Sequence, residues 1–125
     1  MVRILGRAAI AATLCIASAA LADGDAEKGH AVFHTQCAIC HRITPDGAKS
    51  IGPNLFGVVG RKSGTLAGYS YSSAMKASNL TWNDATLEQY LPAPMKLIPG
   101  IKMTYAGLKN PAQLADLIAY LNTAK

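Results

Sequence analysis

The spacing of apolar residues is most regular near the C-terminal end of the chain. Four of them recur at i, i+3, i+4 and i+7, which places them on one helical face: Leu114, Leu117, Ile118 and Leu121. Asn110 can cap such a helix, and Pro111 suits its first position because the amide hydrogen that proline lacks is not needed there. The pattern predicts a helix that begins at Pro111.

Three shorter helices are predicted upstream. Residues 25–35 start with Asp25, whose carboxylate suits a helix N-terminus, and their apolar positions follow helical spacing at Gly29, Val32 and Phe33. Residues 71–77 form a second candidate. A third begins with a cap at Asn83 and Asp84 and ends before Pro92 and Pro94.

The rest of the chain lacks a regular period. Residues 42–68 are rich in glycine and proline, and residues 92–107 are expected to be irregular as well. A loop as long as the first is unusual inside a compact domain unless it wraps something that is not protein. No run shows the β-branched alternation of a strand. The predicted fold class is all-α.

Residues 1–22 differ from the rest of the chain. Their only charges are Arg3 and Arg7, an uncharged run extends from Ala8 to Ala22, and the run closes on a small-x-small site. It is shorter than the roughly 18 to 20 residues that span a bilayer. We expect a signal peptide cleaved after Ala22, which places a single domain of residues 23–125 in the periplasm.

Length and charge narrow the classes of function. The chain has 125 residues and a net charge of +5, and removal of residues 1–22 with Arg3 and Arg7 leaves 103 residues and +3. A domain this small often depends on a metal, a disulfide or a cofactor. Lysines and arginines are scattered, so we expect no nucleic-acid binding. We also expect no permanent membrane insertion and a monomer.

The chemistry-bearing motif is Cys37-Ala38-Ile39-Cys40-His41. This Cys-x-x-Cys-His spacing is typical of covalent haem attachment, with two thiols for the two vinyl groups and an adjacent imidazole for the iron. A thioredoxin-like redox pair would need a βαβ context, and a zinc site would need two further ligands. The motif therefore predicts one haem c, attached through Cys37 and Cys40 with His41 on the iron.

A sixth iron ligand would close the site to other molecules and raise the reduction potential if it were a methionine. The candidates are Met75, Met95 and Met103, although methionine is more often a core residue. His30 and His34 are the other candidates, although their i, i+4 spacing on the first predicted helix could instead bind a surface metal or leave both simply exposed.

The chain resembles the class I, mitochondrial-type c cytochromes, and in particular small bacterial cytochrome c2-like carriers. The similarity extends over essentially all of residues 23–125. It rests on collinear blocks: residues 24–29, the Cys37–His41 motif, residues 52–55 and 60–62, Tyr71, Trp82, residues 90–91, 99–100, 102–103, 106–107 and 116–121.

The resemblance implies a small cytochrome c fold of three to five short helices with long loops around the haem. It implies that Met103 is the distal ligand and that the Pro53 carbonyl accepts the second ring proton of His41, which strengthens the imidazole as a donor. It also implies haem contacts from four further residues, the first three near the propionates: Arg61, Tyr71, Trp82 and Tyr90.

Several positions depart from that family. Ile101 stands where relatives commonly have threonine, Met75 where they have asparagine, and Tyr105 where phenylalanine is usual. Some lysines that usually surround the haem edge are replaced, by Gln36, Ser50 and Met95. Lys96, Lys102 and Lys109 remain, so we expect docking to acidic redox partners that is weaker and less salt-dependent than in strongly basic relatives.

The favoured function is a one-electron carrier that is not an enzyme. By resemblance, its donor would be a quinol:cytochrome c oxidoreductase and its acceptor an oxidase or a photosynthetic reaction centre. One alternative is an electron acceptor for a periplasmic dehydrogenase. A peroxidase or gas-binding protein with an open distal site is a second alternative, but the chain offers no obvious distal acid–base histidine.

Overall fold

The computed structural model describes residues 23–125, and the signal peptide predicted for residues 1–22 lies outside this range. Five helices follow one another: α1 (Ala26–Gln36), α2 (Ser73–Ala77), α3 (Asp84–Tyr90), α4 (Pro94–Leu97) and α5 (Pro111–Thr123). Within the described range there is one isolated bridge between Lys62 and Thr81 and no strand. The all-α prediction is confirmed. In the same range, none of the helices has the length and apolar character needed to cross a membrane.

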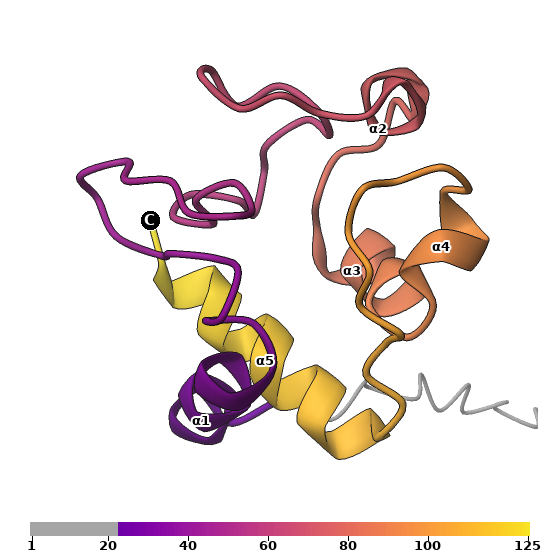
Figure 1. Ribbon diagram of the computed structural model, residues 1–125. Helices are drawn as coiled ribbons and strands as arrows, with labels where there is room; N and C mark the ends of the chain where they lie inside the picture. The colour runs from indigo at the N-terminus through magenta and orange to yellow at the C-terminus, as the bar shows by residue number, and fades with distance from the viewer. Residues whose placement is uncertain (1–22) are drawn as a thin grey trace, which may run out of the picture.

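The first and last helices cross each other and close the fold (Figure 1). Gly29 is buried at the crossing, where an added Cβ would lie 1.9 Å from the Asp116 carbonyl oxygen. The rings of Phe33 and Tyr120 pack beside it with centroids 5.5 Å apart. The Asp25 amide donates to the Asp116 carboxylate at 2.8 Å, so residues 91 positions apart are joined. The absence of a side chain at Gly29 is what permits this approach.

Side-chain caps explain why most helices could be predicted. The Asp25 carboxylate accepts from two first-turn amides of α1, and the Asn110 side chain does the same for α5. At α3, Asn83 and Thr86 form a reciprocal capping box. Helix α2 begins two residues later than predicted because Ser72 caps it, its hydroxyl accepting from the Met75 amide at 3.0 Å.

The prediction that residues 92–107 are entirely irregular was wrong. Pro94, which was interpreted as a stop, is the first residue of α4 and is buried. Proline fits this first position because its amide would have no partner within the helix. The turn has no side-chain cap, and the Lys96 and Leu97 amides simply bond to the Ala93 carbonyl. The sequence therefore lacked a start signal for α4.

Residues 42–68 form the predicted loop, and Asn54 organises it. This side chain is 2% exposed and donates to the carbonyls of Thr44 at 3.0 Å and Ala48 at 2.8 Å, while its oxygen accepts from the Phe56 amide at 2.8 Å. One amide thus satisfies backbone groups on both limbs of the loop. The loop runs along one side of the molecule, and the segment after α4 runs along the other (Figure 1).

Candidate functional site

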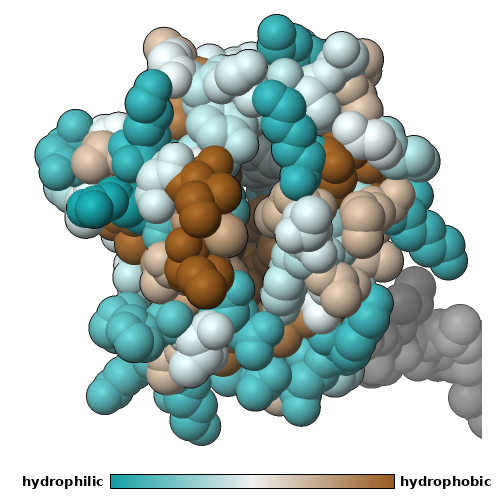
Figure 2. Space-filling model, viewed as in Figure 1, coloured by the Kyte–Doolittle hydropathy of each residue, from teal (hydrophilic) through white to brown (hydrophobic). Residues whose placement is uncertain are grey.

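A cavity of about 530 Å³ lies between these two sides. That size is within the usual range for small-molecule and cofactor sites, about 300–1,000 Å³. Figure 2 shows a hollow in this face with hydrophobic side chains gathered on its rim. Predicted site residues from the whole length of the fold line it: Cys37, Cys40, His41, Pro53, Arg61, Tyr71, Trp82, Tyr90 and Met103. The structure therefore brings all nine together.

The two cysteines lie in the turn that follows α1. The Cys37 carbonyl accepts from the amides of Cys40 at 3.0 Å and His41 at 2.9 Å, which curls the motif so that all three side chains line one cavity. Neither cysteine is in a disulfide. Burial, together with the neighbouring Cys40, raises the pKa of the Cys37 thiol to about 11. A reactive redox thiol acts as the thiolate, so this environment disfavours the redox-pair interpretation.

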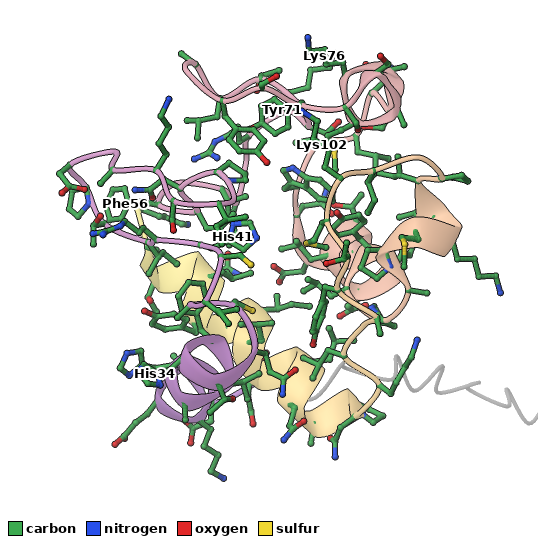
Figure 3. The ribbon with its side chains drawn as sticks, in the orientation of Figure 1. His34, His41, Phe56, Tyr71, Lys76 and Lys102 are labelled. Carbon is green, nitrogen blue, oxygen red and sulfur yellow. The ribbon has the colours of Figure 1, made fainter. Side chains whose placement is uncertain are left out.

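The orientation of His41 is fixed by its neighbours in the loop. Its Nδ1 lies 2.8 Å from the Pro53 carbonyl oxygen, which accepts a hydrogen bond from that nitrogen. Gly52 lies against the ring, and a Cβ there would be 2.6 Å from the Cε1 atom. Burial lowers the pKa of His41, only partly opposed by the bond to Pro53, and so favours the neutral, metal-binding form. Figure 3 shows the ring directed toward the central space. The Pro53 contact implied by the resemblance is confirmed as a hydrogen bond.

Met103 and Met75 both line the cavity, whereas Met95 is 50% exposed on α4. A smaller hollow of about 70 Å³ is lined by both of these inner methionines and by His41 and Ile101. Met95 therefore lies outside the cavity, and Met75 and Met103 are the two methionine candidates that line it. Met103 comes from the irregular segment after α4, and Met75 comes from α2.

Arg61, Tyr71, Trp82 and Tyr90 also line the cavity. The Arg61 guanidinium donates to the carbonyls of Asn54 at 3.1 Å and Phe56 at 2.5 Å. Burial raises the pKa of Tyr71, while the backbone of Leu66 and the Arg61 charge oppose that rise.

The two other aromatic residues pack together. The rings of Trp82 and Tyr90 have centroids 4.8 Å apart. Both residues are buried, and burial raises the pKa of Tyr90 to about 12. Among the described residues, no hydrogen bond is made by the indole N–H of Trp82 or the hydroxyl of Tyr90. Both residues line the cavity, so these polar atoms can donate hydrogen bonds to a ligand within it.

His30 and His34 lie away from the cavity on the exposed side of α1, and Figure 3 shows His34 directed outward. His30 packs on Tyr120 with ring centroids 5.1 Å apart. No group of three histidine, cysteine or acidic side chains able to hold a metal ion is found in residues 23–125. Both histidines are exposed, as one of the two interpretations expected.

The three lysines expected to lie near the haem edge differ in their contacts. Lys102 donates to the Ser70 carbonyl at 2.8 Å, and Lys109 donates to the Pro92 carbonyl. Lys96 is exposed on α4 and makes no hydrogen bond with the described part of the chain.

Three features were not identified from the sequence as parts of the site. Gly52 and Asn54 were recognised in a motif but given no role, although a Gly-Pro-Asn run in a loop is a signal for a tight, side-chain-bonded turn. A hydrogen bond from the Tyr105 hydroxyl to the Gln36 side chain, 3.1 Å long, crosses between α1 and the Met103 segment. Its partners are 69 residues apart, so no local pattern indicates it.

The donor set fits a covalently attached haem. Two thiols stand beside an oriented imidazole whose burial favours the neutral form, a thioether lies in the same cavity, and most of the remaining lining is apolar or aromatic. Gly52 keeps clear the space that the imidazole occupies. Cys37 and Cys40 would hold the haem through thioether bonds, which fix a ligand in place without a dissociation equilibrium.

The chain is similar to known proteins over most of its length. A family model for cytochrome c matches residues 26–125. Cytochrome c2 of Rhodomicrobium vannielii is 47% identical over 116 residues, covering 93% of this chain and 92% of the relative. Cytochrome c of Gibberella zeae is 50% identical over 101 residues, covering 81% and 95%. Cytochrome c of Chlamydomonas reinhardtii is also 50% identical over 101 residues, covering 81% and 90%.

These similarities include the helices, the Cys-x-x-Cys-His motif and the segment that carries Met103. The chain belongs to the cytochrome c family, whose members are electron carriers rather than enzymes and bind haem c covalently through this motif, here at Cys37 and Cys40.

Proposed function

We propose that this protein is a periplasmic one-electron carrier whose axial iron ligands are His41 and Met103. The observation that carries the proposal is that the oriented imidazole and the Met103 side chain line one cavity with both cysteines. When bound, the haem supplies a reversible Fe(III)/Fe(II) couple. The Pro53 carbonyl keeps the His41 proton on Nδ1, which leaves Nε2 free to bind the metal.

The side chains of the cavity wall affect the relative stability of the ferric and ferrous states of the haem iron. Apolar and aromatic side chains exclude water and so disfavour the more positive ferric state. Arg61, Tyr71 and Trp82 are proposed to serve the propionates, because buried carboxylates need donors or a countercharge. A filled sixth position prevents binding of oxygen or peroxide, which separates this function from the peroxidase alternative.

The proposed donor is a quinol:cytochrome c oxidoreductase-type complex, and the acceptor is an oxidase or a photosynthetic reaction centre. The relative named cytochrome c2 and the signal-peptide pattern of residues 1–22 support this placement. An acceptor role for a periplasmic dehydrogenase is the variant that uses the same site. Intact-mass analysis of protein from the periplasmic fraction should give residues 23–125 plus one haem, and a membrane-bound species that retains Cys15 would contradict the location.

Partners are proposed to dock at the cavity mouth, as one-to-one complexes with the monomer. Ile39 and Ile51 line this mouth and are 81% and 74% exposed, so the contact includes an apolar part. Lys96, Lys102 and Lys109 supply positive charge for acidic partners. Such a mixed face predicts a moderate dependence on salt.

A ligand test decides the main proposal. The absorption spectrum of the purified protein should be six-coordinate and low-spin, and Met103→Ala should give a high-spin or weakly ligated haem with a lower potential. Met95→Ala, at an exposed position, is the matched control and should change neither property. A high-spin spectrum in the unmodified protein would favour an open-site function instead.

A docking test uses charge removal. Lys96→Gln with Lys102→Gln should slow electron transfer to an acidic partner through the association rate, with an effect that fades as ionic strength rises past about 0.15 M. Lys28→Gln, on exposed α1 and outside the cavity lining, is the control. Equal slowing by the control would show that only net charge matters and that this face is not the docking site.

A further inference from the structure

The segment that carries Met103 is attached by few hydrogen bonds. Within the part of the chain that the structure describes, no backbone–backbone hydrogen bond involves residues 102–107. Two side-chain contacts hold the segment instead. Lys102 donates to the Ser70 carbonyl at 2.8 Å, and the Tyr105 hydroxyl donates to the Gln36 Oε1 atom at 3.1 Å. The position of Met103 therefore depends on these two contacts and on packing.

The contact between Tyr105 and Gln36 joins the two walls of the cavity. Gln36 is the last residue of α1 and directly precedes Cys37, and Tyr105 lies two residues after Met103. Both side chains line the cavity. The hydrogen bond thus links the end of the haem-attachment helix to the segment that bears the thioether.

In this pair the Tyr105 hydroxyl donates and the Gln36 amide oxygen accepts, so a phenylalanine at position 105 would have no polar atom to make the bond. We infer that Gln36 and Tyr105 are a matched pair of positioning residues, whose hydrogen bond holds the Met103 segment closed over the cavity. This inference rests on the proposed role of Met103 as an iron ligand.

The expected size of the effect follows from the bond type. A neutral hydrogen bond between partly exposed groups changes a conformational equilibrium by about two- to tenfold. Loss of this bond should raise the equilibrium constant for opening of the Met103 segment by about two- to tenfold. Global stability should change less than local opening, since neither side chain belongs to the buried core, although Tyr105 packs against it.

Imidazole competition on the ferric holoprotein measures the opening. Added imidazole replaces the Met103 sulfur when the segment opens, and the loss of the sulfur-ligated spectrum reports the apparent affinity. Tyr105→Phe and Gln36→Met each remove one partner without adding charge, and each should raise that affinity about two- to tenfold. The double variant should raise it no further than the single variants, because both remove the same bond. Gln36→Glu keeps an acceptor and should retain the low affinity of the unmodified protein.

Matched controls come from α5. Tyr120→Phe and Gln113→Met make the same chemical changes outside the cavity lining, and neither should alter imidazole affinity. Unchanged affinity in Tyr105→Phe, or effects of the two single variants that multiply in the double variant, would overturn the inference. Denaturant unfolding of each variant checks that the fold is retained. If Met103→Ala leaves the spectrum unchanged, the proposed ligand set fails, whereas failure of the pair alone leaves that ligand set standing.

Discussion

Substitution of Gly52 by alanine tests how the loop orients His41. Gly52 is not in the left-handed region of backbone conformation, so an alanine there meets no backbone strain. Its Cβ, however, would lie 2.6 Å from Cε1 and 2.8 Å from Nδ1 of the ring. An ordinary contact begins near 3.4 Å, so the ring or the loop must move by nearly 1 Å. The 2.8 Å bond from Nδ1 to Pro53 is the contact that this movement disturbs.

The loss in the free energy of unfolding caused by Gly52→Ala follows from those contacts. Loss of a hydrogen bond to a buried group costs about 1–3 kcal/mol, and an overpacked contact costs about 1–3 kcal/mol. Because the two share one displacement, we expect about 2–4 kcal/mol in total. For a domain of this size each 1 kcal/mol lowers Tm by about 4–8 °C, which gives a loss of about 10–30 °C. Weaker donation by His41 should also raise the reduction potential.

Thermal unfolding of the holoprotein and voltammetry provide the assay. Gly68→Ala is the control, because Gly68 has a φ of +80° and no atom within 4 Å of an added Cβ. It should cost only the backbone strain of about 1–2 kcal/mol and leave the potential unchanged. If Gly52→Ala lowers Tm no more than this control and leaves the potential unmoved, the steric role of Gly52 is refuted.

Three further outcomes are expected. Met75→Asn should lower the reduction potential measured by voltammetry, and by more than Ile101→Thr, because an amide in the cavity stabilises the ferric charge. Burial raises the pKa of Tyr90 from 10.0 to about 12, so the folded state keeps this proton where the unfolded chain loses it. Stability should therefore fall as pH rises from 10 to 12, and Tyr90→Phe should reduce that fall in denaturant titrations. Gly29→Ala should lower Tm by about 5–20 °C, since the added Cβ meets a backbone carbonyl of α5 and overpacking costs about 1–3 kcal/mol.

Sequence reasoning succeeded where local signals determine the structure. Asp25 and Asn110 mark helix starts through short-range hydrogen bonds to nearby amides, and the structure contains both bonds. Helix α4 was missed because Pro94 begins a single turn without a polar cap. Proline both ends and begins helices, and only its burial against the rest of the fold decided between these two possibilities here.

The site shows the same division between local and distant information. Cys37, Cys40 and His41 are close in sequence, so their spacing alone indicated the chemistry. The bond between Gln36 and Tyr105 depends on how two distant segments meet, and no periodicity encodes it. Among the methionines, the resemblance favoured Met103, whereas the structure excludes the exposed Met95 from the cavity wall and leaves both Met75 and Met103 on it.

The crossing of α1 and α5 has a consequence for the order in which the protein matures. During synthesis from the N-terminus, α1 emerges about 75 residues before the start of the helix that buries Gly29 and Phe33. A pairing of such distant segments forms late, because the intervening chain must first be closed into a loop. Because Cys37 and Cys40 directly follow α1, both thiols become available before the helix that completes the fold has been synthesised.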